Sequence, residues 1–68
     1  MKTILLDKMA RAAIKFASDD MGTAERMIFA GLKDGRGVEL RRKYAARRLK
    51  SAKEQLTAAI VLLEGELE

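Results

Sequence analysis

The stretch Lys33-Asp34-Gly35-Arg36-Gly37 decides the fold that we predict for this 68-residue chain. Its two nearby glycines suit the left-handed backbone with which helices commonly end. Proline is absent from the chain, so long helices are favoured on both sides of this stretch. We therefore predict an all-α fold in which two helical arms, joined by a turn at 33–37, form an antiparallel hairpin.

The arm after the turn is expected to be one long helix over about residues 38–67. Its apolar residues largely alternate steps of three and four, which is the spacing of helices in coiled coils and bundles. This stripe is predicted to be buried, and it consists of Val38, Ala45, Leu49, Ala52, Leu56, Ala59, Ile60, Leu63 and Leu67.

The arm before the turn shows a helical face followed by an interruption. Asp19, Asp20 and Gly22 come soon after this face, and aspartate favours caps over helix interiors. We therefore predict that the first arm is broken near Ser18–Gly22, with a shorter helix over 21–33. The face itself consists of Leu5, Met9, Ala12, Ala13 and Phe16.

Charge is distributed in blocks that suit an antiparallel hairpin. Residues 1–18 carry a net +3, residues 19–34 carry −2, residues 36–53 carry +7 and residues 54–68 carry −4. Folding back places the +3 block beside the −4 block and the −2 block beside the +7 block. The last pairing leaves an excess of positive charge on the first half of the long helix.

That basic half is the candidate partner-binding region. On a helical wheel Lys43, Arg47 and Lys50 point away from the core, whereas the stems of other cations flank it. Such a patch suits an acidic protein surface, suits phosphates of RNA or DNA, or is a solvated face paired within the chain. The candidate residues are Arg36, Arg41, Arg42, Lys43, Tyr44, Arg47, Arg48 and Lys50.

Apolar residues make up 49% of the chain, more than one hairpin comfortably hides. The segment 21–33 is apolar nearly all round, which is typical of a helix buried on several sides. We therefore predict a homodimer in which two hairpins join as a helical bundle. The expected interface residues are Met27, Ile28, Phe29, Leu32 and Leu62. A second stripe that suits close helix packing comprises Tyr44, Ser51, Ala58 and Leu62.

The composition argues against several functional classes. The chain has no histidine or cysteine, so neither a usual nucleophile–base pair nor a thiolate or imidazole metal site is expected. We predict no enzymatic activity, no cofactor and no metal. The longest apolar run, Ala58 to Leu63, is too short to span a membrane. We expect a single domain over residues 1–68 and a cytoplasmic location.

These observations predict a small, non-enzymatic protein-interaction module. Such a module would be an adaptor, a regulator or an inhibitor of a larger protein machine, of a size that suits a phage or mobile element. The alternative is an RNA- or DNA-binding regulator that uses the basic half of the long helix. Against this alternative, the chain has one tyrosine, two phenylalanines and no tryptophan for stacking on bases, and no zinc-finger, ribonucleoprotein or basic-zipper motif. A helix-turn-helix can be fitted to residues 23–49, but a recognition helix that also forms the long arm of a hairpin is unusual.

Overall fold

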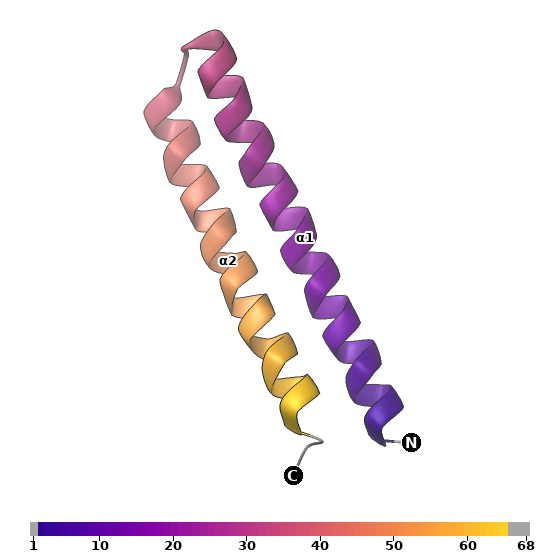
Figure 1. The fold of residues 1–68 in the computed structure, drawn as a ribbon. Helices are drawn as coiled ribbons and strands as arrows, with labels where there is room; N and C mark the ends of the chain where they lie inside the picture. Colours follow the sequence, from indigo (N-terminus) through magenta and orange to yellow (C-terminus); the bar gives the residue numbers. More distant parts are fainter. Residues whose placement is uncertain (1, 66–68) are drawn as a thin grey trace.

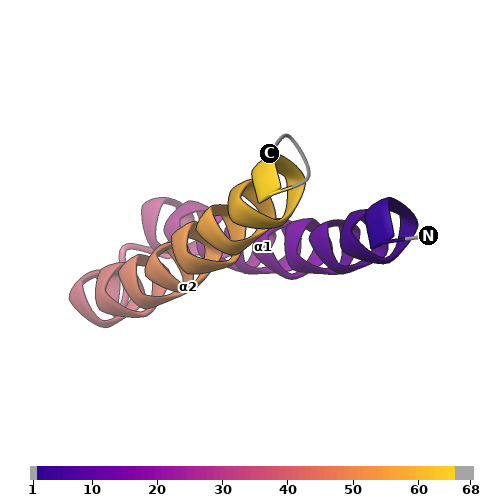
Figure 2. The same ribbon diagram turned by 90° about the horizontal axis from the view of Figure 1, so that it is seen from below.

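The computed structural model describes residues 2–65, with side chains from residue 3 onward, and in this part of the chain the fold is a two-helix antiparallel hairpin. Helix α1 spans Lys2–Asp34 and helix α2 spans Val38–Glu64 (Figure 1). The molecule is a slender rod whose Cα atoms extend over 50 × 14 × 11 Å. Seen from below, the two helices cross rather than run strictly parallel (Figure 2). The predicted all-α hairpin is confirmed.

The turn forms where the two glycines predicted it. Gly35 has a φ of +67°, and its N–H donates to the carbonyl of Gly31 at 2.9 Å, which closes the end of α1. Gly37 has a φ of +58° and caps α2, where its carbonyl accepts the N–H of Arg41 at 2.9 Å. Both residues therefore hold a left-handed backbone, which glycine adopts without the strain that a Cβ would add.

The predicted break near Ser18–Gly22 is wrong, because α1 runs through it without interruption. Asp20 does not cap a helix end but lies between the two helices, where α2 supplies hydrogen-bond donors to its carboxylate. Helix α2 ends at Glu64, with Gly65 as its C-cap. The end predicted for this helix near residue 67 lies outside the described residues.

Alanines form the core between the two helices, which we call the seam. Three alanines on each helix recur at seven-residue intervals, at positions 10, 17 and 24 and at positions 45, 52 and 59, and a strict repeat of seven keeps one side of a helix facing its partner. Their methyl groups are small, so the two backbones can approach closely. The buried seam alanines are Ala10, Ala13, Ala17 and Ala24 on α1, and Ala45, Ala52 and Ala59 on α2.

Most large apolar side chains that the sequence predicted to be buried are instead exposed. In the predicted stripe of α2 the alanines are buried, but Leu56 is 36% exposed and Ile60 is 54% exposed, and Leu49 and Leu63 lie between these values. Because a seam between only two helices is narrow, it cannot cover a stripe several residues wide. The same holds in α1, where Ala13 is buried while the larger members of the predicted face, Leu5, Met9 and Phe16, are exposed.

The surface area measures how much the hairpin leaves uncovered. Its accessible surface is 5750 Å² for a chain of 7.6 kDa. A globular protein of this mass exposes about 4300 Å². The hairpin therefore exposes roughly a third more surface than a globular chain of equal mass, and many large apolar side chains contribute to it.

Candidate interaction surface

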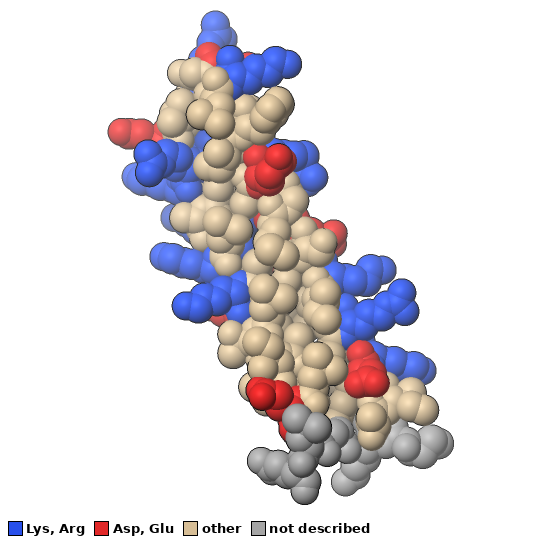
Figure 3. All heavy atoms as spheres, viewed as in Figure 1, with Lys and Arg blue, Asp and Glu red and all other residues tan. Residues whose placement is uncertain are grey.

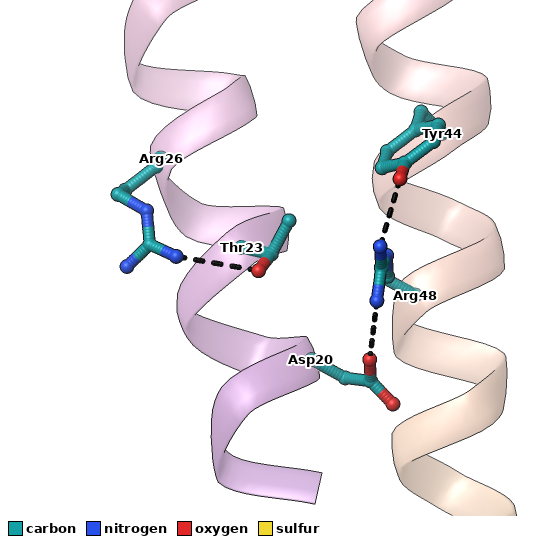
Figure 4. Close-up of polar contacts among 5 residues, drawn as sticks. All are labelled: Asp20, Thr23, Arg26, Tyr44 and Arg48. Atoms are coloured by element: carbon teal, nitrogen blue, oxygen red, sulfur yellow. Dashed lines mark hydrogen bonds and ion pairs between the residues drawn. The ribbon is translucent and has the colours of Figure 1, made fainter. Parts of the chain in front are cut away.

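A polar cluster spans the seam near the middle of the hairpin. Asp20 is only 9% exposed, and its carboxylate accepts a hydrogen bond from Nη1 of Arg48 at 3.0 Å (Figure 4). The Ser51 hydroxyl is the other donor that acts on this carboxylate. Chiefly the Ser51 bond, and then the Arg48 bond, hold the pKa of Asp20 below its ordinary value, against the opposing effect of burial. The charged carboxylate therefore links α1 to α2.

Arg48 is held within the chain from two sides. Its Nη2 donates to the Tyr44 hydroxyl at 2.8 Å, and its guanidinium carbon lies 5.2 Å from the centroid of the Tyr44 ring. The Tyr44 hydrogen bond, followed by the Asp20 hydrogen bond, raises the pKa of Arg48. Figure 4 shows Arg48 reaching between Tyr44 and Asp20. Two of the predicted partner-binding residues, Arg48 and Tyr44, thus already contact each other.

Arg41 is the second predicted partner-binding cation that has an acidic partner in the chain. Its Nη2 lies 3.6 Å from a carboxylate oxygen of Asp34, so this ion pair ties the end of α1 to the start of α2. Its Nη1 is buried and has no hydrogen-bond partner among the residues that the structure describes. Arg41 therefore supports the turn as well as contributing charge to it.

The remaining predicted cations are exposed and form no ion pair within residues 3–65. Lys43, Arg47 and Lys50 lie on the side of α2 that faces away from α1, as the helical wheel predicted, and we call them the basic outer side. Arg36 in the turn and Arg42 are also exposed. Their charge is available to a partner.

Apolar side chains adjoin the basic outer side near the turn. An open hollow at the start of α2 is lined by Leu40 and Tyr44 together with Lys43 and Arg47, and Met27 of α1 forms part of its wall. Leu40 is 76% exposed, which is unusual for so large an aliphatic side chain. This end of the molecule therefore offers apolar contact and positive charge in one place.

A broad apolar surface covers one face of the hairpin. It is formed by the residues four positions after the seam alanines that repeat every seven residues, and these residues lie on the same face of both helices because the helices are antiparallel. Met21 and Ile28 of α1 line an open hollow together with Leu49 of α2, which confirms that the rows adjoin. We call this set the aliphatic face, and it comprises Ile14, Met21, Ile28, Leu49, Leu56 and Leu63, all exposed.

The space-filling view displays a face of this kind. Uncharged side chains of both helices form a continuous band along the visible side of the rod, and most Lys and Arg side chains project from its two margins (Figure 3). Periodicity alone does not reveal this surface, because several of its leucines also fit the stripe predicted for the core of one chain. The seven-residue recurrence of alanine is the signal that separates the seam from the face.

The predicted dimer-interface residues occupy different environments. Ile28 belongs to the aliphatic face, and Phe29 and Leu32 are exposed beside it, at 60% and 81%. Met27 and Leu62 are only half-buried, and Leu62 packs against the alanine core of its own chain. These two residues therefore already have a role within the hairpin.

Residues 2–65 contain no group of acidic side chains arranged to hold a metal ion. None of the described helices has the length and apolar character needed to cross a membrane. Comparison with protein-family models, curated proteins and solved structures finds no match to this chain. Evidence about the function of this chain therefore comes from its own surfaces.

Proposed function

We propose that the chain is a small, non-enzymatic protein-interaction module that binds an acidic surface of a larger protein, as an adaptor, regulator or inhibitor. The observation that carries this proposal is the basic outer side, Lys43, Arg47 and Lys50, which is exposed beside an apolar hollow and has no acidic partner among residues 3–65. Positive charge of this kind attracts an acidic partner and speeds association.

The hollow favours a protein over a nucleic acid as the partner. Protein interfaces place aromatic and apolar side chains at their centre and polar groups at the rim, and Tyr and Arg are enriched among the residues that dominate binding. Leu40 and Tyr44, with Arg47 at their side, match that composition. An RNA or DNA partner, contacted through its phosphates by the same cations, is the second candidate.

We also infer that the working unit is a homodimer. The hairpin exposes about 1450 Å² more than a globular protein of its mass. Each partner in a standard stable interface buries about 800 Å². The excess area is thus sufficient for a second copy, and its apolar character supplies the driving force for association.

Affinity purification from the native host tests the proposed binding function. The wild-type chain is compared with Lys43→Glu/Lys50→Glu, which reverses charge on the basic outer side. Lys8→Glu/Lys15→Glu is the matched control, because both lysines are exposed and occupy the equivalent outward position of α1. Each bait is used with and without nuclease, and the captured proteins are identified by mass spectrometry.

We expect the wild type and the control to retain the same acidic protein after nuclease treatment, and the α2 variant to lose it. Capture of nucleic acid alone, abolished by nuclease, would instead support the RNA- or DNA-binding alternative. Equal capture by both charge-reversal variants would contradict a role for the basic outer side.

A further inference from the structure

The aliphatic face points to a specific arrangement of the homodimer, so this inference rests on the dimer proposed above. We propose that a second copy of the chain packs its own aliphatic face onto this one, with the two turns at opposite ends of a four-helix bundle. The occupant is a second copy because the pattern of apolar and charged residues along this face complements itself in both helices.

The aliphatic face is better suited to a bundle core than the opposite face. Its inner rows hold a large aliphatic residue at most positions. The corresponding rows on the opposite face, four positions before seam residues, include Asp20, Arg41, Arg48 and Gln55, so they offer less apolar area. On that opposite face the Ser51 hydroxyl also acts as a donor to the Asp20 carboxylate. Packing a second copy on the aliphatic face leaves that polar cluster untouched.

The residues of this face and its outer margin alternate steps of three and four, which is the spacing of a second packing seam on each helix. In α1 the row runs through positions 4, 7, 11, 14, 18, 21, 25, 28 and 32, and in α2 through positions 39, 42, 46, 49, 53, 56, 60 and 63. Each helix can therefore pack against its hairpin partner and against a second hairpin at the same time.

The opposite-end arrangement places like helices side by side, α1 on α1 and α2 on α2, each pair antiparallel. Ser18 and Lys53 then lie at the twofold axis, and both are about 17 residues from the turn, so one axis satisfies both rows. Met21 meets Ile14 of the second copy. Leu49 meets Leu56 of the second copy, so the central layers are aliphatic.

Charge distinguishes this arrangement from the one with both turns at the same end. With the turns opposed, Glu25 meets Arg11 of the second copy, and Arg42 shares a layer with Asp7 of the second copy. With the turns together, Glu25 meets an alanine, Arg11 meets an isoleucine, and no opposite charges pair. Only the opposed arrangement gives attractive contacts, each of which occurs twice by symmetry.

Net charge favours the same arrangement. The turn half of the hairpin carries +5, made up of −2 from residues 19–34 and +7 from residues 36–53. Opposed turns keep the two positive halves apart. Lys53 of one copy faces Lys53 of the other copy at the twofold axis. Because Lys53 is exposed at the margin of the face, its long side chain can place the charged amine in solvent.

Cysteine cross-linking tests the orientation directly. The native chain has no cysteine, so a single introduced thiol reports on one contact. Ser18→Cys is expected to give a covalent dimer on oxidation or with a short bis-maleimide, because Ser18 meets itself only when the turns are opposed. Asp19→Cys is the matched control, since its side chain lies one residue away and outside the aliphatic face.

A covalent dimer of Ser18→Cys but not of Asp19→Cys supports the arrangement. Absence of the Ser18→Cys dimer, or equal cross-linking of both variants, would overturn it. Circular dichroism of each variant confirms that the helices remain folded.

A charge swap gives an independent test that a general structural effect would not mimic. Arg11→Glu and Glu25→Arg are each expected to raise the dimer dissociation constant on the order of tenfold, because each replaces two attractive contacts by two repulsive ones. The double variant Arg11→Glu/Glu25→Arg restores attraction and should recover the wild-type constant in sedimentation equilibrium. Residues 11 and 25 lie about 21 Å apart along the same helix, so rescue requires contact between copies.

Sedimentation of the isolated chain separates this inference from the proposed binding function. A dimer in which the double variant fails to recover affinity contradicts the orientation alone. A folded monomer at tens of micromolar contradicts both the dimer and its orientation. Neither result bears on the purification experiment, which depends on Lys43 and Lys50 outside the dimer face.

Discussion

Asp20 shows how the environment of one residue decides its role. Aspartate is a poor residue for a helix interior, and together with Gly22 it suggested a break in the first arm. In the folded chain the Asp20 carboxylate is buried in the seam and receives donors from Ser51 and Arg48 of α2. The contact between the helices offsets the weak local preference, so α1 continues.

The Asp20 contacts predict that acid destabilises the hairpin. The folded state lowers the pKa of Asp20 below its ordinary value of 3.8. A lowered pKa gives stability that is fully present above the unfolded pKa and is lost as pH falls through the folded pKa. We expect the urea concentration at the unfolding midpoint of the wild type to decrease when the pH is lowered from about 6 to about 3, which is the range in which carboxylates become protonated.

Asp20→Asn should have a lower midpoint at pH 6 and a smaller change on acidification. Asp19→Asn is the control, because the Asp19 carboxylate is exposed and forms no ion pair within the described residues. An unchanged acid dependence in Asp20→Asn would show that other carboxylates govern the acid response.

Gly22 is a position where a single substitution is expected to stabilise the folded hairpin. It lies inside α1, where glycine costs about 1 kcal/mol relative to alanine. A Cβ at this position would meet only the Arg26 guanidinium at 3.4 Å, the mobile end of a flexible side chain. Gly22→Ala is therefore expected to raise the free energy of unfolding by roughly 0.5–1 kcal/mol.

The same substitution at Gly37, Gly37→Ala, is expected to lower the free energy of unfolding. Gly37 has a φ of +58°, where a Cβ is strained although no atom lies within 4 Å of it. This variant should lose about 1–2 kcal/mol. Chemical denaturation of the two variants beside the wild type measures both effects, and a shift of the same sign in both would contradict this account.

At the scale of the helix, the sequence predicted the elements well and the packing poorly. The turn glycines and the spacing of apolar residues were sufficient to place two arms and a hairpin. They were not sufficient to choose the buried side, because both alanines and leucines lie on the apolar stripe. Ala52 is 2% exposed while Leu56, one turn later, is 36% exposed. The seven-residue alanine repeat resolves this choice.

The candidate site was predicted in part. Lys43, Arg47 and Lys50 face outward as their positions on a helical wheel required. Arg41 and Arg48 were named with them, but both have acidic partners in α1. Pairing between distant residues depends on the register of the two helices, which periodicity in one helix does not reveal.

The alanine seam predicts a severe effect of added volume. Ala52→Leu would force a large side chain between two closely packed backbones, and overpacking of this kind typically costs about 1–3 kcal/mol. Ala12→Leu is the control, because Ala12 is exposed and a surface change of this type usually stays within about 0.5 kcal/mol. Chemical denaturation of both variants at one protein concentration makes the comparison. Equal stability of the two would contradict a closely packed seam.

At the scale of the molecule, the exposed aliphatic rows connect stability to association. Leu56→Asp adds a charge to the aliphatic face rather than to the seam. A carboxylate that is buried without a partner is costly, so we expect this variant to weaken the proposed dimer by several kcal/mol. Leu40→Asp is the matched control, with the same chemical change on a leucine outside that face.

Sedimentation equilibrium should show a monomer for Leu56→Asp and a dimer for both Leu40→Asp and the wild type at the same concentration. A monomer from both aspartate variants would point to a different association surface.

The Cα atoms of the two helices extend only 14 × 11 Å across the 50 Å length of the rod, and no leucine among residues 3–65 is fully buried. In the proposed bundle, each copy supplies the interior that the other lacks, and mass action then makes the folded fraction rise with the number of chains present. If the proposed dimer forms, a scarce chain would melt at a lower temperature, and be more open to proteases, than an abundant one. Synthesis of many copies would switch the population to the folded form.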